Sequence, residues 1–259
     1  MYQLKQDYKV PTCYIAHDSG HFDIYGNDAQ KYWQAIDFIG FRSNYIKREF
    51  ESSDEYIKPS FYCYSGIPIN YCDNIKYRSW ENVNRVAYVG TLISRKYPAT
   101  IVSAMHQVFD NDFLLQYAGD GYESKNIIKE AYELGVSEQV KLLGRIDRTE
   151  VVRLMDNSDL FIMISSKETF GLVYLEAMAR GCLTIASRKE GFDGIIQHGY
   201  NGFLCEAGNN KELVSIIREI KEMSPTKRSI ISNNAMNTAK ELTDEKAAKY
   251  YLEQILNSK

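Results

Sequence analysis

From residue 85 onward, short apolar segments alternate with longer segments whose apolar residues recur at helical spacing. Residues 85–90 (RVAYVG) are typical of a buried strand, and residues 97–109 have the spacing of an amphipathic helix. The alternation continues to about residue 235. Repeated strand and helix segments of this kind pack as a parallel sheet with helices on its faces, because parallel strands need long crossover connections. We therefore predict an α/β fold with a doubly wound, Rossmann-like parallel sheet.

The predicted elements divide the chain into four parts. Strands are predicted at 85–90, 113–121, 139–144, 159–165, 183–187 and 201–206. Helices are predicted at 97–109, 123–135, 147–158, 171–181 and 210–223. Upstream, strands are predicted at 12–17, 37–43 and 60–66, and helices near 28–36 and at 44–52. We predict a partial N-terminal Rossmann-like domain (1–72), a polar linker (73–84), a complete C-terminal domain (85–241) and a C-terminal helix (242–259).

Composition and charge exclude several classes of protein. The net charge is −3 and the isoelectric point is near 5.9, which argues against a nucleic-acid partner. The five cysteines are scattered and form no C-x-x-C pair, so neither a zinc site nor a disulfide framework is expected. No apolar run approaches the roughly 20 residues that span a bilayer, and residues 1–10 lack the apolar core of a signal peptide. A cytoplasmic location is expected.

The stretch 165–181 (SSKETFGLVYLEAMARG) joins a predicted strand to a predicted helix and contains two glutamates. Ligands of open α/β sheets bind beyond the carboxyl ends of the strands, and the first N–H groups of a helix attract anions. Gly171 leaves the backbone accessible there, which predicts a phosphate site. Glu168 and Glu176 would flank a bound diphosphate and bind sugar and ribose hydroxyls. Alternatively, Glu168 only favours the helix dipole and Glu176 is only solvated.

The run 167–187 (KETFGLVYLEAMARGCLTIAS), followed by 199–209 (GYNGFLCEAGN), resembles the signature of the retaining glycosyltransferases of the GT-B fold, family 4, also called glycosyl transferases group 1. The resemblance covers about residues 85 to 235. It implies transfer of a sugar from a nucleotide-diphosphate sugar to a hydroxyl acceptor, a saccharide or a lipid-linked saccharide, with retention of the anomeric configuration. The expected process is cell-surface polysaccharide or glycolipid synthesis, without a cofactor or a metal.

The resemblance also assigns roles to the residues of this motif. Glu168 would bind hydroxyl groups of the donor sugar, and Glu176 would bind the ribose. The backbone of the intervening turn would contact the sugar and the phosphates through Thr169, Phe170, Gly171 and Leu172. The run 90–96 (GTLISRK) resembles the turn after the first strand of the family, where Lys96 would neutralise the diphosphate leaving group. Gly90 begins this turn, Thr91 stands where the family has arginine, and Arg95 is a candidate to replace that charge.

Three further segments receive roles from the same resemblance. Gly119 and Gly121 end a strand and would allow the nucleotide to approach closely. Arg145 and Ile146 would border the base, and His17 would lie across the cleft near the sugar and the acceptor. The run 110–112 (DND) matches a metal-binding D-x-D motif, but it lies between a predicted helix and the next strand, at the end of the sheet away from ligands.

Residues 1–72 are too few for a complete first domain of this family. The chain is therefore expected to be a fragment, or to depend on a second polypeptide for the missing part, with weak or absent activity on its own. A truncated, non-catalytic nucleotide-sugar-binding remnant or subunit is the alternative function. A nucleotide-sugar epimerase is a third hypothesis, against which the paired glutamates argue. Lipid-linked acceptors, which are common in such families, would favour peripheral association with the inner face of the membrane.

Overall fold

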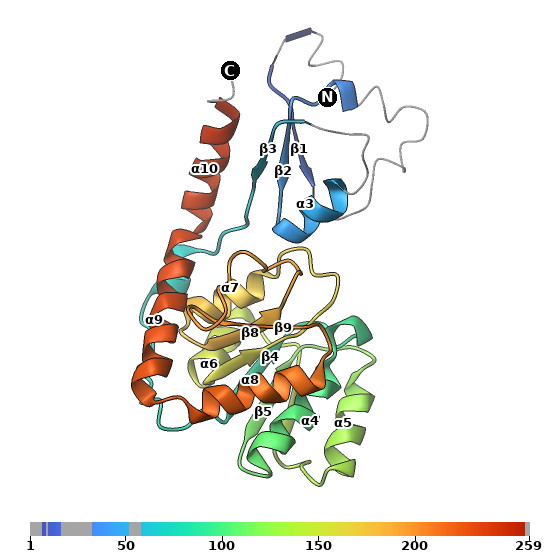
Figure 1. Cartoon of the computed structure of the whole chain (residues 1–259), viewed down its shortest axis with the longest axis vertical. Helices are drawn as coiled ribbons and strands as arrows, with labels where there is room; N and C mark the ends of the chain where they lie inside the picture. Colours follow the sequence, from blue (N-terminus) through green and yellow to red (C-terminus); the bar gives the residue numbers. More distant parts are fainter. Residues whose placement is uncertain (1–6, 9, 17–32, 52–57, 257–259) are drawn as a thin grey trace.

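The computed structural model describes residues 7–8, 10–16, 33–51 and 58–256 of the 259-residue chain. They form a three-stranded sheet near the N-terminus and a six-stranded sheet in the remainder of the chain (Figure 1). Every recorded strand pair within the two sheets is parallel. The predicted α/β class and the doubly wound parallel sheet are confirmed.

The six-stranded sheet has the strand order β6-β5-β4-β7-β8-β9. Its strands are β4 (Arg85–Val89), β5 (Leu114–Ala118), β6 (Val140–Gly144), β7 (Leu160–Ile162), β8 (Leu183–Ser187) and β9 (Phe203–Cys205). The first strand of this sheet along the chain is β4, which has a central position. The next two strands, β5 and β6, lie on one side of it, and β7, β8 and β9 lie on the other side. The order therefore reverses between β4 and β7, and ligand sites of such sheets lie at this reversal, beyond the carboxyl ends of the strands.

Helices cover both faces of this sheet and enclose the larger hydrophobic core. They are α4 (Pro98–Phe109), α5 (Ser124–Glu133), α6 (Arg148–Asp156), α7 (Leu172–Ala179), α8 (Asn210–Glu222) and α9 (Pro225–Glu241). The strands β7, β8 and β9 are buried along their whole length, as expected of parallel strands covered on both faces. This explains why they appear in the sequence as continuous apolar runs.

The smaller sheet has the order β1-β2-β3, with β1 at Cys13–Ala16, β2 at Phe38–Phe41 and β3 at Ser60–Tyr62. Helix α3 (Asn44–Glu51) packs on it around a second, smaller core that includes Phe50. The observed strands match the predicted positions and are shorter than predicted. The helix predicted near 28–36 falls mostly on residues outside the described part of the chain.

The predicted linker, residues 73–84, is irregular in structure but is bound to the larger domain. The Arg78 guanidinium donates hydrogen bonds to the carbonyls of Met155 (2.7 Å), Ser158 (3.0 Å) and Arg180 (2.6 Å). The Trp80 side chain is buried, and its carbonyl accepts a hydrogen bond from Arg228 at 2.6 Å. The sequence predicted only a polar linker; in the structure the Arg78 side chain of this segment satisfies buried carbonyl groups.

Helix α9 was not predicted from the sequence. Its residues are mostly small or polar, so they form no apolar stripe along one side of the helix. The helix begins at a good N-cap, Ser224, whose side chain accepts a hydrogen bond from the N–H of Lys227. It packs closely on the segment that follows α7, where Ser232 Oγ donates to the carbonyl of Gly181 at 2.7 Å. Small residues permit this close packing, although they weaken the sequence pattern.

The C-terminal helix α10 (Asp244–Leu256) connects the two parts of the structure. Figure 1 shows it running beside β3 of the small sheet. The Tyr251 ring lies 5.8 Å from the Phe61 ring, and Ile67 forms a parallel bridge with Thr243. The terminal helix therefore returns to the N-terminal sheet and packs against it. Among the described helices, none is long and apolar enough to cross a membrane.

Candidate functional site

Two loops meet at the reversal of the strand order. The first follows β4 and contains the short helix η3 (Ser94–Lys96); the second follows β7 and is called the 165–171 loop below. Two hydrogen bonds join them: the Ser166 N–H donates to the Arg95 carbonyl at 2.7 Å, and the side-chain Nη1 of Arg95 donates to the Ser166 carbonyl at 3.0 Å. Because β4 and β7 are neighbours, these distant segments meet at the same edge of the sheet.

Lys96 and Glu168 face each other at this junction. Lys96 Nζ lies 3.3 Å from Glu168 Oε2, and the two side chains are only 12% and 13% exposed. Ser165 Oγ donates to the same carboxylate oxygen at 3.1 Å, and Arg95 Nη1 lies 3.8 Å from it. The Lys96 and Glu168 side chains are largely removed from water, so their charges act on neighbouring groups with less screening than at the surface. The structure thus brings together the two residues predicted to act on the sugar and on the leaving group.

Arg95 also reaches this junction, as the sequence suggested for a replacement charge. Its guanidinium is 40% exposed and is held against the 165–171 loop. Thr91 lies nearby in an exposed position, and its carbonyl accepts a hydrogen bond from the Tyr88 hydroxyl at 3.0 Å. A positive charge is therefore present beside Glu168 although Thr91 itself has none.

Gly171 immediately precedes α7 and has a φ of +86°. A Cβ atom at this position would lie 2.4 Å from the Tyr174 ring, so a larger residue would be both strained and obstructed. The buried Tyr174 hydroxyl donates to the Met163 carbonyl at 2.9 Å. These contacts fix the entry of the chain into α7, and the first N–H groups of this helix have no carbonyl within the helix to bind.

The remaining residues of the turn differ in exposure. Phe170 is buried and its ring stacks on Tyr64, with the ring centres 5.9 Å apart, so it contributes to the contact with the segment after β3. Thr169 is half-buried, and Leu172 is 37% exposed. The predicted backbone contacts of these residues with a sugar diphosphate stay predictions.

Glu176 lies within α7 and is only 8% exposed. Its Oε1 lies 3.3 Å from Arg148 Nη2, at the beginning of α6. Burial raises the pKa of the Glu176 carboxyl, and Arg148 opposes this shift. A carboxylate held in a site that disfavours its charge is more typical of a functional position than of a solvated helix residue. The alternative of a merely solvated Glu176 is therefore wrong.

Arg145 and Ile146 lie between β6 and α6, in the same region as Arg148. Arg145 is exposed and Ile146 is half-buried. The capping box formed by Asp147 and Glu150 fixes the start of α6 directly after them. The placement is compatible with a contact to a nucleotide base, which stays a prediction.

The structure gives Gly119 and Gly121 a role in packing. A Cβ atom on Gly119 would lie 2.0 Å from the Gly90 carbonyl oxygen, and one on Gly121 would lie 2.2 Å from the Leu92 carbonyl oxygen. The loop after β4 thus fills the space that a side chain would take at these two positions, and the predicted approach of the nucleotide stays a prediction. The glycines allow two protein loops to pack together. Gly90 lies at this junction, where a Cβ atom would be 3.4 Å from Lys96 Nζ.

His17 lies outside the described residues, so its predicted place across the cleft is not described. The D-x-D run lies in the turn between α4 and β5, at the edge of the sheet opposite to Lys96 and Glu168. The part of the chain that the structure describes contains no group of three or more histidine, cysteine, aspartate or glutamate side chains that could bind a metal ion.

Sequence reasoning missed three residues of the site, namely Ser165, Arg148 and Glu190. Arg148 was hidden in the capping-box sequence of α6, whose pattern indicates only a helix start. Glu190 Oε2 accepts a hydrogen bond from the N–H of Glu168 at 2.9 Å. Its segment, 190–195 (EGFDGI), has no recognisable spacing relation to Glu168, so no sequence signal identified this contact.

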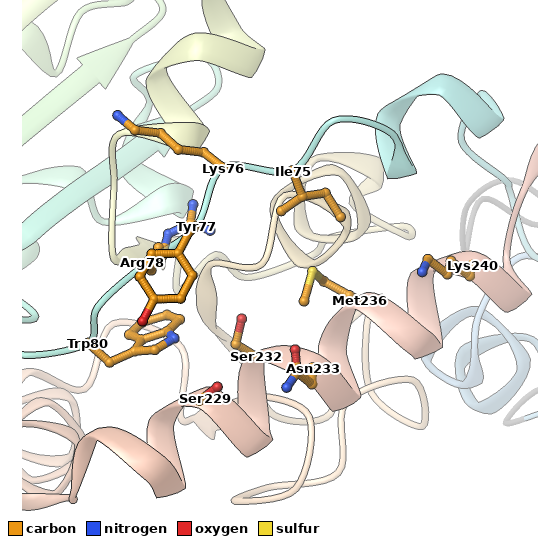
Figure 2. Close-up of a pocket in the computed structure, with 10 residues that line it drawn as sticks. All are labelled: Ile75, Lys76, Tyr77, Arg78, Trp80, Ser229, Ser232, Asn233, Met236 and Lys240. Carbon is orange, nitrogen blue, oxygen red and sulfur yellow. The ribbon is translucent and has the colours of Figure 1, made fainter.

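A separate pocket lies away from this site. It has a volume of about 460 Å³, and Figure 2 shows side chains of residues 75–78 and of Trp80 on one side and of α9 on the other. Neither Lys96, Glu168 nor Glu176 lines it. The Arg78 side chain, which is in its wall, is already bound to three backbone carbonyls. The pocket therefore belongs to the packing of the connecting segment on α9.

Glu176 gives a prediction for stability in the absence of a ligand. Its pKa in the folded state is raised above the ordinary value of 4.5, so the folded state binds more protons than the unfolded state between these two pKa values. Stability therefore falls as the pH rises through this window. Glutamine mimics the protonated form, so Glu176→Gln is expected to melt at a higher temperature than the wild type at about pH 8. For a chain of this size, a gain of roughly 1 kcal/mol in the free energy of unfolding raises the melting temperature by about 2–4 °C.

The check is a pair of thermal melts, at about pH 3.5 and about pH 8. The difference between Glu176→Gln and the wild type is expected to vanish at the lower pH, where the carboxyl is protonated in both states. Glu222→Gln, at an exposed position of α8, is the matched control and is expected to leave both melts unchanged. A lower melting temperature for Glu176→Gln at the higher pH would contradict the direction of the shift.

Comparisons with known proteins agree on one family. A family model described as "Glycosyl transferases group 1" matches residues 73–238. An N-acetyl-alpha-D-glucosaminyl L-malate synthase of Bacillus anthracis is 42% identical over 102 residues, which are 39% of this chain and 26% of that protein. A lipopolysaccharide core biosynthesis glycosyltransferase, LpsE, of Rhizobium meliloti is 32% identical over 135 residues, or 52% of this chain and 38% of that protein. The chain thus spans less than half of the length of these relatives.

Solved structures resemble a larger part of the chain. The structure of Anabaena HepE in complex with UDP aligns with a TM-score of 0.81 and 21% identity, covering 99% of this chain and 75% of that chain. The sucrose-phosphate synthase of Thermosynechococcus elongatus aligns with a TM-score of 0.77 and 20% identity, covering 99% and 69% of the two chains. At these identities the likeness concerns the fold.

Proposed function

Because the chain belongs to the glycosyl transferases group 1 family, we propose that it transfers a sugar from a nucleotide-diphosphate sugar to a hydroxyl acceptor with retention of configuration. Its fold is that of the GT-B glycosyltransferases. The acceptor is proposed to be a saccharide or a lipid-linked saccharide of the cell surface, which agrees with the lipopolysaccharide core relative. The observation that carries the proposal is the contact of 3.3 Å between Lys96 and Glu168 beside the start of α7.

The proposed roles follow from charge and position. The diphosphate of the donor lies between Lys96 and the first N–H groups of α7, which attract anions. Glu168 accepts hydrogen bonds from hydroxyl groups of the donor sugar, and Glu176 binds the ribose from within α7. Arg95 adds a second cation on the side where the family motif has the arginine that Thr91 replaces. HepE, which has the same fold, was solved in complexes with UDP and with UDP-glucose.

Transfer with retention needs no nucleophile from the protein in this arrangement. The acceptor oxygen attacks the anomeric carbon on the face from which the diphosphate departs, through a transition state with oxocarbenium character. The bond from the anomeric carbon to the phosphate oxygen breaks, and the departing phosphate takes the acceptor proton. The protein contributes alignment of the reactants and stabilisation of the charge that develops on the leaving group. No metal is required in this scheme, because Lys96, Arg95 and α7 carry the opposing charge.

Binding of a nucleotide sugar without transfer is the second candidate function. Thr91 favours it, because the charge on that position is absent and Arg95 is partly engaged by carbonyl groups. Dependence on a second polypeptide that contributes the acceptor side is a further part of the proposal. Peripheral association with a membrane surface is proposed only for a lipid-linked acceptor.

Calorimetric titration with UDP, GDP and ADP tests the donor site. One of the three nucleotides is expected to bind, and Glu176→Gln is expected to weaken it about tenfold or more, since roughly 1.4 kcal/mol is lost with a charge-assisted hydrogen bond. Glu222→Gln is expected to bind like the wild type. Binding that is the same in Glu176→Gln and in the wild type would contradict the ribose assignment.

Transfer itself is measured with the nucleotide sugar of the base that binds. The product's anomeric configuration is read from its NMR coupling constant, and the same configuration in donor and product is expected. Release of a different free sugar in the absence of an acceptor would favour the epimerase hypothesis. Binding without any transfer, with several saccharide acceptors, would select the non-catalytic alternative.

A further inference from the structure

We propose that Glu190 is a positioning residue for sugar transfer: its carboxylate fixes the backbone of the 165–171 loop and thereby aims Glu168 at the donor sugar. The inference rests on the proposed function, since it concerns the same site. Glu190 itself belongs to the loop between β8 and β9 and is not a proposed ligand of the substrate.

The first support is the local conformation of the 165–171 loop. Lys167 has a φ of +54°, a left-handed conformation that is rare for a residue other than glycine. Such a turn points successive backbone N–H groups in one direction and forms an anion-binding concavity. Glu190 Oε2 occupies it, at 2.9 Å from the N–H of Glu168, and the N–H of Lys167 also donates to this carboxylate. The unusual turn is thus matched by a side chain that stabilises it.

The second support is the packing of the next residue. A Cβ atom on Gly191 would lie 2.4 Å from the Glu168 carbonyl oxygen and 2.6 Å from the Phe170 nitrogen. The backbone at Gly191 is therefore in direct contact with the backbone of residues 168–170. Together, the Glu190 carboxylate and the Gly191 backbone hold the residue that carries the proposed sugar-binding carboxylate.

The third support is the anchoring of the loop that carries Glu190. Arg48, on α3 of the N-terminal domain, donates to the Lys189 carbonyl at 2.7 Å and to Asp193 Oδ2 at 3.0 Å. The Asp193 N–H donates to the carbonyl of Glu190 at 2.9 Å. Glu190 is therefore attached on one side to the other domain and on the other side to Glu168. A loose loop would lack the rigidity that positioning requires.

The position of Glu168 matters because its other contacts are directional. Its carboxylate meets Lys96 and Ser165 Oγ at 3.3 and 3.1 Å, and both contacts change if the backbone at Glu168 turns. Burial raises the pKa of Glu190, while the hydrogen bonds from the Glu168 and Lys167 N–H groups lower it, which agrees with a carboxylate retained for these two contacts.

The test compares Glu190→Ala, Glu190→Gln and Glu190→Asp with the wild type. Alanine removes the acceptor, aspartate is one methylene too short to reach the Glu168 N–H, and glutamine retains an acceptor oxygen at the same distance. We expect kcat for transfer to fall by about 10–100-fold in Glu190→Ala and Glu190→Asp, because misplacing a catalytic group by about 1 Å has an effect of this size. Glu190→Gln is expected to retain most of the wild-type kcat.

The affinity for the nucleotide alone, without the sugar, is expected to change by less than about threefold in all three variants, since Glu176 and α7 are untouched. Glu222→Ala, at an exposed position of α8, is the matched control and is expected to match the wild type in every measurement.

A second measurement does not depend on activity. Amide hydrogen exchange, followed by NMR, reports whether the N–H groups of Lys167 and Glu168 are held. We expect exchange of both to accelerate by about tenfold or more in Glu190→Ala and Glu190→Asp, and to change little in Glu190→Gln. If Glu190→Ala does not fold, Glu190→Asp gives the same comparison.

The outcomes separate the two proposals. A wild type that neither binds a nucleotide nor transfers sugar, combined with accelerated exchange in Glu190→Ala, would overturn the proposed function and leave the backbone contact intact. Unchanged exchange in Glu190→Ala and Glu190→Asp would overturn the positioning role, whatever the activity of the wild type. Accelerated exchange with an unchanged kcat in an active enzyme would also overturn it, because the contact would then serve folding alone.

Discussion

Replacing Lys96 with methionine is expected to lower kcat for sugar transfer by about 10²–10³-fold, which is the usual effect of removing one group that stabilises charge in the transition state. Lys96 is 12% exposed, so its ammonium acts on the departing diphosphate with little screening. Methionine has a similar shape, and Lys96 Nζ already lies 3.6 Å from the Met163 sulfur, so the substitution fits its surroundings. The KM for the donor is expected to rise less than kcat falls, because the charge develops mainly as the bond breaks.

The measurement is steady-state transfer with the nucleotide sugar that the wild type binds. Lys227→Met is the matched control: Lys227 is exposed and lies near the start of α9, which follows α8 and is at the opposite edge of the sheet from the site. Its kcat is expected to equal that of the wild type. A decrease of less than about threefold in Lys96→Met would contradict the role of Lys96 in stabilising the leaving group.

A double substitution distinguishes a direct action of Lys96 on the diphosphate from an indirect action through Glu168. If Lys96 acts only by holding Glu168, Lys96→Met combined with Glu168→Gln will transfer sugar as slowly as Glu168→Gln alone. If Lys96 acts on the diphosphate, the double variant is expected to be slower than either single variant. Because the two side chains are in contact, their effects are not expected to be simply additive.

Replacing Arg180 with methionine is expected to reduce the free energy of unfolding by about 3–5 kcal/mol, the usual cost of removing one partner of a buried ion pair. Arg180 follows α7 and its side chain is 3% exposed. Its guanidinium donates to both carboxylate oxygens of Asp156, at 2.7 and 3.0 Å. It also donates to three carbonyls of the segment before the larger domain, those of Tyr71, Asp73 and Asn74. Methionine would leave these acceptors without their donor.

The midpoint and slope of urea unfolding give the change in free energy. Arg218→Met, on an exposed position of α8, is the control and is expected to change the free energy of unfolding by no more than about 0.5 kcal/mol. A loss below about 1 kcal/mol in Arg180→Met would mean that water or neighbouring donors replace the guanidinium. Arg180 is distant from Lys96 in the fold, so this prediction does not depend on the proposed function.

The sequence pattern was sufficient to predict the strands and helices whose apolar residues are continuous or recur at regular spacing. The strands β7, β8 and β9 are largely apolar runs because helices cover both faces of the sheet there, and helices such as α5 and α8 have one apolar face. Helix α9 escaped prediction because its packing uses small and polar side chains such as Ser232, which leave no periodic apolar signal. The segment 73–84 was predicted only as a polar linker, because local composition does not reveal that Arg78 binds buried carbonyl groups.

The features of the site can likewise be divided into those that the sequence determined and those that the tertiary structure decided. The sequence by itself determined the chemical groups and their order along the chain: Lys96 after one strand, then Glu168 and Glu176 around the start of a helix, in a motif typical of one family. Only the tertiary structure decided which groups meet. Lys96 reaches Glu168 because the strand order reverses between β4 and β7, Arg148 pairs with Glu176 from another helix, and Glu190 holds the Glu168 backbone. Such contacts depend on side chains and backbone groups that are distant in sequence, so no local periodicity encodes them.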